Sequence, residues 1–177
     1  MVLFSFLFMA ISLSAQRGGN YASSIGLSGG YAEDGFGIMA TYNYHLDRST
    51  YAQLSIFAAI AEDKGDYDIP YNIFTVQPGY FLKVWEQPNF RRYALNISGG
   101  GIIGYEVINN GNNTLDNGAV IDGKSRFIYG IYAGVEWEMI LGNDLSLLVK
   151  ANEYYHINSD VGNFYPYVGI GLRYFLF

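Results

Sequence analysis

The sequence predicts an all-β fold, an eight-stranded antiparallel up-and-down transmembrane β-barrel of the outer-membrane type, after an N-terminal signal peptide. Half of the 177 residues are hydrophobic and only 15% are charged, yet beyond the first fifteen positions no apolar run is long enough for a membrane helix. Gly, Tyr and Phe, which suit strands and bends, are abundant. Apolar residues also recur at every second position in one segment after another, as in strands with one apolar face.

The first fifteen residues, MVLFSFLFMAISLSA, resemble a secretory signal peptide, with an apolar core followed by small residues at a cleavage site before Gln16. The basic segment that usually precedes such a core is missing. We therefore expect residues 1–15 to be a signal peptide and residues 16–177 to form one barrel domain. The alternative is a short anchor that is never removed, although the run is shorter than the roughly 20 residues of a spanning helix.

The first four strands are expected within residues 21–31, 35–44, 52–60 and 74–84. Their apolar faces are, in order, Tyr21, Ile25, Leu27 and Tyr31; Phe36, Ile38, Ala40, Tyr42 and Tyr44; Ala52, Leu54, Ile56, Ala58 and Ile60; and Phe74, Val76, Tyr80, Leu82 and Val84. The opposite faces carry small or polar residues such as Ser24, Ser28, Thr41, Asn43, Gln53, Ser55, Thr75 and Gln77. Each apolar face is close to the roughly 9–11 residues that a tilted strand needs to cross a membrane.

The last four strands are expected within residues 92–105, 127–138, 145–152 and 165–177. Their apolar faces include Tyr93, Leu95, Ile97, Ile103 and Tyr105; Phe127, Tyr129, Ile131, Val135 and Trp137; Leu145, Leu147, Val149 and Ala151; and Val168, Ile170, Leu172, Tyr174 and Leu176. In water the final segment, YPYVGIGLRYFLF, would be an exposed edge strand prone to aggregation. In a closed barrel it becomes the strand that pairs with the first.

The polar faces favour a membrane barrel over a soluble one. A soluble sandwich or lipocalin-like barrel has the same period of two, but it presents many Lys, Glu and Asp side chains to water. Here the polar faces consist mostly of Gly, Ala, Ser, Thr and Asn. Such small residues fit the narrow lumen of an eight-stranded barrel, which side chains fill.

The connections predict an orientation. If the chain starts in the periplasm, the inner turns are the short segments 45–49, 86–89 and 141–144, and the outer loops include residues 62–70 and about 106–125. The outer loops contain ten of the sixteen acidic residues, namely Glu33, Asp34, Glu62, Asp63, Asp66, Asp68, Glu106, Asp116, Asp122 and Asp160. We expect residues 106–125 to fold partly as a hairpin, because Asn-Gly and Asp-Gly pairs within them favour tight turns.

Two prolines lie inside the predicted strands, Pro78 and Pro166. A proline has no N–H to donate to a neighbouring strand, and a closed barrel has no free edge where this would be harmless. Each proline is therefore expected to mark a bulge or a strand end.

Five charged residues fall on predicted lumen faces: Arg92, Glu136, Glu138, Lys150 and Arg173. Charges in a low-dielectric interior are tolerated only when they are paired and hydrogen-bonded. We expect these residues to form a network of salt bridges that holds the barrel shut. The alternative is a path for protons or ions.

The remaining residues show no pattern that predicts an enzyme. We therefore expect no catalytic, cofactor or metal site and no small-molecule substrate. Cysteine is absent, and a net charge of −6 with few, dispersed basic residues argues against direct binding of nucleic acid. Residues 118–125, GAVIDGKS, match the phosphate-binding loop pattern, but a strand follows them where that loop needs a helix. A lipid-modifying barrel enzyme that uses His156 with Ser159 remains an alternative.

Four segments resemble the TraO-type conjugative transposon proteins of Bacteroidota: IPYNIFTVQPGYFLKV (69–84), GYEVINNGNNTLDNGAVI (104–121), RFIYGIYAGVEWE (126–138) and SDVGNFYPYVGIGLR (159–173). The resemblance covers roughly residues 60–177, and Pro78 and the Tyr165-Pro166 pair depart from the family pattern. It implies a component of a conjugative transfer (mating) apparatus in the outer membrane, in contact with membrane lipid and with other apparatus proteins.

The predicted barrel limits what such a component can do. A lumen filled by side chains is too narrow for DNA, so we expect a structural or anchoring role without conduction of DNA. The alternatives are a free-standing small barrel that acts in adhesion or envelope integrity and, third, the lipid-modifying enzyme.

Overall fold

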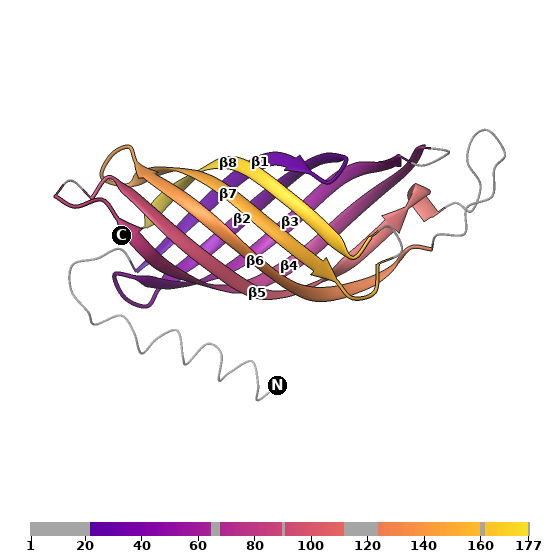
Figure 1. Cartoon of the computed structure of the whole chain (residues 1–177), viewed down its shortest axis with the longest axis horizontal. Helices are drawn as coiled ribbons and strands as arrows, with labels where there is room; N and C mark the ends of the chain where they lie inside the picture. Colours follow the sequence, from indigo (N-terminus) through magenta and orange to yellow (C-terminus); the bar gives the residue numbers. More distant parts are fainter. Residues whose placement is uncertain (1–21, 65–67, 90, 112–123, 160–161, 177) are drawn as a thin grey trace, which may run out of the picture.

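The computed structural model describes residues 22–64, 68–89, 91–111, 124–159 and 162–176, and within them eight antiparallel strands close into a barrel in chain order (Figure 1). The strands are β1 (Ser23–Ala32), β2 (Gly35–His45), β3 (Thr50–Lys64), β4 (Asp68–Glu86), β5 (Tyr93–Ile108), β6 (Arg126–Ile140), β7 (Leu145–His156) and β8 (Phe164–Leu176). A single 3-10 turn among the described residues, η1 (Asn109–Gly111), follows β5. This architecture confirms the predicted fold class. The expected signal peptide lies outside the described residues.

β8 pairs with the whole length of β1, from Ser23 opposite Leu176 to Ala32 opposite Tyr167. The apolar final segment is therefore the closing strand, as predicted. Pairing on both sides of every strand satisfies most backbone N–H and C=O groups without water, as a lipid environment requires. Among the described residues, no helix is long and apolar enough to cross a membrane.

The outer wall of the barrel is apolar along every strand. Large apolar side chains point outward from each of them, and examples are Leu27, Phe36, Ile60, Phe74, Ile103, Ile131, Val149 and Ile170. Ile60 is the most exposed of these, at 71%. In water such a continuous apolar surface would drive aggregation, whereas hydrocarbon solvates it. The assignment of faces from the period of two is thereby confirmed.

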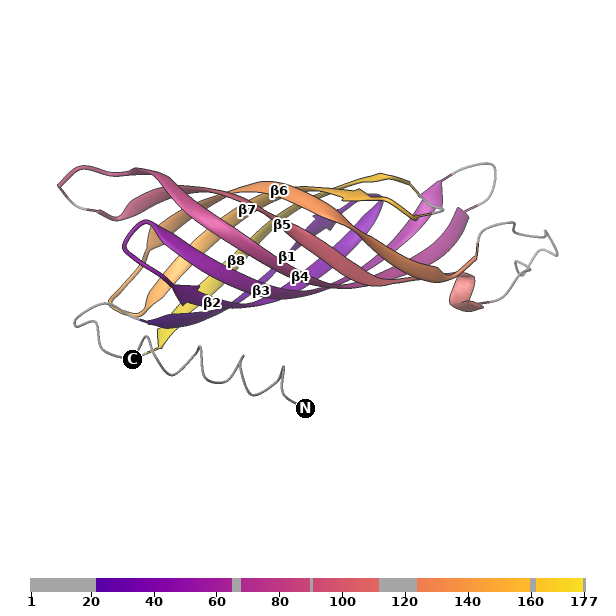
Figure 2. The same cartoon turned by 90° about the horizontal axis from the view of Figure 1, so that it is seen from below.

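The two ends of the barrel differ (Figures 1 and 2). The turn end carries the connections 46–49, 87–92 and 141–144, together with the start of β1 and the end of β8. The loop end carries the connections 33–34, 65–67, 109–125 and 157–163 and includes η1. Figure 2 shows that the β4–β5 hairpin reaches beyond the other two connections at the turn end.

The lumen is filled by two kinds of side chain. Toward the loop end lies an apolar and aromatic cluster that includes Met39, Phe57, Ile73, Tyr132, Tyr154 and Tyr167. Toward the turn end lie buried polar and charged residues such as Gln53, Asn96, Glu136, Lys150 and Arg173. The prediction of a hydrophilic lumen face is therefore right for the turn-end half, although large side chains such as Arg173 and Lys150 fill it, and wrong for the loop-end half. Glycines make room there: a Cβ on Gly79 would lie 1.8 Å from the Tyr132 hydroxyl.

The predicted outer loop 62–70 is wrong, because the structure continues β3 and β4 through most of it. Pairing runs on to Lys64 opposite Asp68, which leaves only residues 65–67 undescribed between the strands. Three consecutive charged residues, 62–64, interrupt the alternation of apolar and polar residues, so the sequence does not show that the strand continues. A strand that extends past the hydrocarbon needs no apolar face.

The predicted loop 106–125 is shorter at its N-terminal end and ends as predicted. β5 continues to Ile108, η1 follows with Gly111 at φ 84°, and β6 begins at Arg126. Glu106, predicted in this loop, is instead a fully buried residue of β5. Residues 112–123, which carry most of the predicted hairpin, lie outside the described residues.

Neither proline ends its own strand, but each lies where pairing on one side stops. Pro78 is paired with Leu54 of β3, whereas the β4–β5 ladder omits Gln77 and Pro78 and resumes without a change of register. Pro166 is paired with Glu153 of β7, just beyond the last β1–β8 pair. The missing N–H therefore does not require a bulge at either proline.

The bulge in β4 lies nearer the turn end, between Lys83 and Trp85. It places Val84 and Trp85 both on the exposed side, at 48% and 49% exposure. Without the bulge, Trp85 would share the inward face of Lys83. Trp85 instead joins the outer wall near the stacked rings of Tyr93 and Trp137, as expected for an aromatic girdle.

The β2–β3 turn is organised by Asp47. Its carboxylate accepts hydrogen bonds from the backbone N–H of Ser49 at 2.6 Å, from the N–H of Thr50 at 2.9 Å and from the Thr50 hydroxyl at 2.7 Å. These donors, the Ser49 N–H first, lower the pKa of Asp47 below its usual value.

We expect Asp47 to titrate below an ordinary aspartate in carboxyl NMR, and Thr50→Val to raise its pKa because the hydroxyl bond is lost. Since the folded-state pKa is the lower one, this turn adds stability above the unfolded-state pKa and loses it as pH falls through the folded value. An unchanged pKa in Thr50→Val would contradict the assigned bond.

Candidate functional site

Four of the five predicted lumen charges meet in the turn-end half of the barrel: Glu136 and Glu138 of β6, Lys150 of β7 and Arg173 of β8. The register places Glu136 directly opposite Lys150. Arg173 reaches both glutamates from β8. We call these four residues, with Tyr51 of β3, the lumen charge cluster.

Glu136 is the centre of the lumen charge cluster and is only 1% exposed. Its Oε1 accepts hydrogen bonds from Arg173 Nη2 at 2.8 Å, from the Tyr51 hydroxyl at 2.7 Å and from Asn96 Nδ2 at 3.2 Å. Its Oε2 accepts from Lys150 Nζ at 2.7 Å and from Arg173 Nη2 at 2.9 Å. Both oxygens of this carboxylate are therefore satisfied by donors from four other strands.

The two cations of the cluster are held by aromatic rings as well as by carboxylates. The Arg173 guanidinium lies 4.9 Å from the ring centre of Tyr51, and Lys150 Nζ lies 5.3 Å from that of Phe81. The two rings stack with centres 4.6 Å apart. Lys150 Nζ also donates to Gln53 Oε1 at 3.2 Å. Cation–π contacts of this kind strengthen when the pair is desolvated.

The charges of the cluster cancel, because two cations face two carboxylates. Burial of any one of them alone would be very costly. The cluster therefore connects strands on opposite sides of the lumen through bonds that cannot be lost singly without a large penalty. Chemically it can hold the wall together and block the lumen.

The prediction for Arg92 is wrong. β5 begins one residue later, at Tyr93, and Arg92 lies exposed in the β4–β5 connection. Its backbone C=O accepts a hydrogen bond from the Ile140 N–H at 2.8 Å. The period of two continues formally to Arg92, but the tight turn before β5 takes the side chain out of the lumen.

Sequence reasoning missed Tyr51 and Phe81 as parts of the site. Both lie in phase with predicted lumen residues, Tyr51 with Gln53 and Phe81 with Gly79 and Lys83. This alternation could have placed both residues in the lumen. It was overlooked because their side chains are aromatic, whereas the predicted lumen faces were small or polar. Their contact with the charges depends on the arrangement across the lumen, which a single strand's pattern does not contain.

The His156 and Ser159 pair is not arranged as a nucleophile and base. The Ser159 hydroxyl donates to Glu106 Oε2 at 2.6 Å, whereas His156 is 2% exposed, stacks against both Tyr154 and Tyr165, and has no partner for its Nδ1. A general base must reach the proton that it removes. The geometry therefore gives no support to catalysis by this pair.

The phosphate-loop motif at 118–125 falls mostly outside the described residues, but the element that follows it is strand β6. A phosphate loop binds through the N-terminus of a helix at that point. In the described part of the chain, no group of three or more His, Asp or Glu side chains could hold a metal ion.

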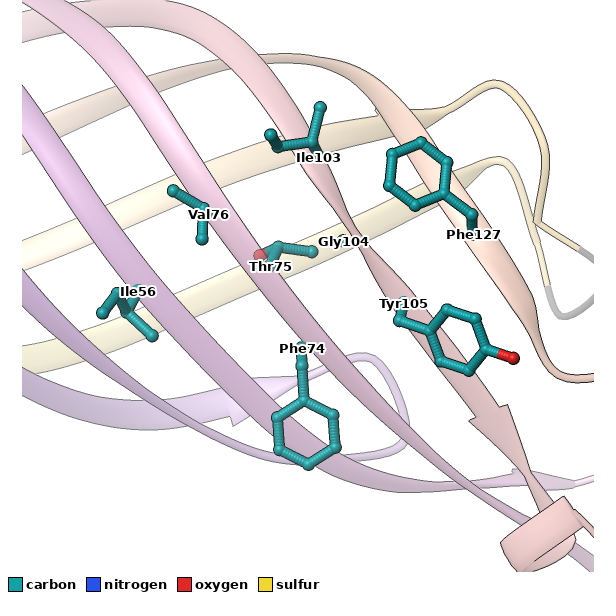
Figure 3. A pocket seen from close by; sticks show the side chains of 8 residues that line it. All are labelled: Ile56, Phe74, Thr75, Val76, Ile103, Gly104, Tyr105 and Phe127. Atoms are coloured by element: carbon teal, nitrogen blue, oxygen red, sulfur yellow. The ribbon is translucent and has the colours of Figure 1, made fainter. Parts of the chain in front are cut away.

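A shallow groove of about 280 Å³ lies on the outer wall (Figure 3). Figure 3 shows its rim of apolar side chains, Ile56, Phe74, Val76, Ile103, Tyr105 and Phe127, around Thr75 and Gly104. The rim belongs to β3, β4, β5 and β6. The groove is part of the apolar wall, which lipid contacts.

The comparisons with known proteins agree with this geometry. The sequence model of a family described as "Conjugative transposon protein TraO" matches residues 13–176. No curated protein matches the chain in sequence.

Several solved structures share the fold at low sequence identity. The N-terminal β-barrel domain of Pseudomonas aeruginosa OprF is 10% identical, with a TM-score of 0.59 over 89% of this chain and 98% of that one. Neisserial surface protein A is 9% identical, with a TM-score of 0.58 over 87% and 94%. A major outer membrane protein of Thermus thermophilus is 13% identical, with a TM-score of 0.52 over 86% and 99%. The fold is thus that of outer-membrane β-barrels, in keeping with the apolar wall.

Proposed function

Because the chain belongs to the TraO family of conjugative transposon proteins, we propose that it is a structural component of a conjugative transfer apparatus, which anchors other subunits in the outer membrane and does not conduct DNA. The family and the barrel fold together support a conjugation-related protein of the outer membrane. The anchoring role is the step that we add.

The observation that carries this proposal is the filled lumen. At the turn end the lumen charge cluster connects β3, β6, β7 and β8 across the interior. At the loop end Phe57 lies in contact with the rings of Tyr154 and Tyr167, with centres 5.7 and 5.2 Å apart. An eight-stranded barrel is just wide enough for its own side chains. DNA and folded proteins must therefore pass elsewhere, and the protein acts through its surfaces.

Two of those surfaces are available to partners besides lipid. The outer wall contacts membrane lipid, and the loop end and the turn end extend beyond it. With the turn end in the periplasm, where short connections are usual, other apparatus proteins would bind there. We assign the lumen charge cluster the role of keeping this platform rigid.

Deletion of the gene from a donor strain tests the proposal. Transfer of the mobile element should fall to the detection limit, while donor growth and resistance to detergents stay normal, because the barrel serves the apparatus and not the envelope. The measurement is transconjugants per donor, with complementation by the wild-type gene and, as a matched control, by an unrelated eight-stranded barrel. Normal transfer together with detergent sensitivity or loss of attachment would contradict the proposal and favour an envelope or adhesion role. An altered lipid A or phospholipid profile would instead favour an enzyme.

A further inference from the structure

One charged residue, Glu153 of β7, interrupts the apolar outer wall. Side chains point outward from β7 at every second position, and they are Leu145, Leu147, Val149, Ala151, Glu153 and Tyr155. Of the charged residues that the structure describes, Glu153 alone lies on the outer wall with apolar outward side chains on both sides of it along its strand. It is exposed, so its carboxylate faces the medium that surrounds the wall.

Glu153 lies on the hydrocarbon side of the aromatic girdle. The next outward residue toward the loop end is Tyr155, whose ring meets that of Phe164 edge to face with centres 5.1 Å apart. Such rings lie at the level of the lipid headgroups. Toward the turn end the wall continues with Ala151 and Val149. Headgroups and water therefore begin beyond the two rings, and the carboxylate faces acyl chains.

The carboxylate has no partner within the described part of the chain. Its neighbours across the two ladders are Ala133 of β6 and Pro166 of β8, neither of which carries a charge. No ion pair among the described residues involves Glu153. An ionised side chain that faces hydrocarbon unpaired is costly and marks a functional position. The outer wall therefore favours a cation at this point.

A second copy of the barrel does not supply that cation from its described residues. Each basic side chain described in this chain lies in the inward phase of its strand or at one end of the barrel. A lipid amine is also poorly placed, because headgroups lie beyond Tyr155 and Phe164. The cation must therefore come from another protein that enters the hydrocarbon.

The wall around Glu153 suits the approach of such a protein. The ladders place Glu153 in one row, which we call the Glu153 row, with the short side chains of Pro166, Ala133 and Gly99. Larger side chains lie in the two adjacent rows, Phe164, Tyr155 and Ile131 toward the loop end and Val168, Val135 and Ile97 toward the turn end. Small residues let a second backbone approach closely within a membrane, which brings its side chains within reach of the carboxylate.

From this arrangement we propose that the Glu153 row docks a membrane-embedded segment of a partner protein, which presents one lysine or arginine side chain to Glu153. The apolar stem of such a side chain packs in hydrocarbon while its charged end reaches the carboxylate. Pairing offsets the cost of both charges at once. This inference rests on the proposed function, because the partner is another subunit of the transfer apparatus.

The first test measures Förster energy transfer in phosphatidylcholine vesicles. The purified barrel carries a label at one cysteine introduced into the β4–β5 connection, and the probe is a synthetic Leu/Ala transmembrane helix with a single arginine in its apolar stretch. This helix should associate about fivefold or more tightly than the same helix with leucine at that position, as expected for a polar contact within a membrane. Equal association of the two helices would overturn the proposal.

Variants locate the contact on the barrel. Glu153→Gln should abolish the preference for the arginine helix, and Ala133→Leu should reduce it by filling the Glu153 row without touching a charge. Glu62→Gln is the matched control, because Glu62 is an exposed glutamate at the loop end, and it should keep the preference. Migration before and after heating checks that each variant is folded. A preference that survives Glu153→Gln would overturn the proposal.

Two further measurements identify the source of the cation. Loss of the arginine preference in phosphatidylethanolamine vesicles would assign the carboxylate to a lipid amine. Energy transfer between differently labelled barrels that disappears in Glu153→Gln would assign it to a second copy of the chain. Either result would overturn a partner protein as the occupant.

Transfer from a donor strain separates this inference from the proposed function. Glu153→Gln should lower the number of transconjugants per donor well below that of Glu62→Gln, with equal amounts of both barrels in the outer membrane. Normal transfer in Glu153→Gln, where deletion of the gene abolishes transfer, would overturn this inference alone. Docking of the arginine helix through Glu153, with unchanged transfer on deletion, would overturn only the proposed function.

Discussion

Replacing Glu136 with alanine is expected to destabilise the barrel by about 3–5 kcal/mol, the usual cost of breaking a buried ion pair from one side. The change removes the acceptor of Lys150, Arg173, Tyr51 and Asn96 at once. Two cations then remain buried with Glu138 as the one carboxylate of the cluster. Their desolvation is no longer offset, and this, more than the lost bonds themselves, sets the size of the effect.

The measurement is equilibrium unfolding by denaturant in lipid vesicles, with Glu62→Ala as the exposed control, which should change stability by less than about 0.5 kcal/mol. A double variant separates charge from packing. Glu136→Leu combined with Arg173→Met leaves Lys150 and Glu138 as one cation and one anion, so it should be less destabilised than the sum of the single changes. Wild-type stability of Glu136→Ala, or simple additivity in the double variant, would contradict a coupled cluster.

Much of this architecture could be predicted because a strand's side chains alternate strictly. Once Val168, Ile170 and Leu172 are assigned to one face, Arg173 must lie on the other. The same argument brings Glu136, Glu138 and Lys150 inside. Their mutual contact then follows from the narrow lumen, in which buried charges must find partners.

The errors have local causes that alternation does not encode. Arg92 is excluded from the lumen because its strand starts one residue later. Polar residues 62–64 continue a strand because β4 is there to pair with them. Tyr51 meets Arg173 across the lumen at a separation of 122 residues, which no local pattern shows.

The pairing of β1 with β8, which we call the closing seam, is where the addition of a single methyl group should have a comparably large effect on stability. Gly30 of β1 lies opposite Gly169 of β8 and Gly37 of β2. A Cβ at Gly30 would come within 2.1 Å of the Val168 carbonyl oxygen and 2.4 Å of the Gly169 Cα. Because both of these are backbone atoms, no side chain can rotate to relieve the contact. Gly30→Ala should therefore force β1 and β8 apart.

We expect Gly30→Ala to cost about 3 kcal/mol, at the upper end for overpacking, and Gly30→Val to prevent closure, so that the protein no longer migrates as a compact species before heating. Gly99→Ala is the matched control, because its added Cβ would meet no atom closer than the Tyr132 carbonyl oxygen at 3.5 Å. Both variants reduce the flexibility of the unfolded chain in the same way, so their difference isolates the contact at the seam. Equal stability of the two alanine variants would mean that β1 and β8 can separate at this point without loss, and that the seam does not limit the stability of the barrel.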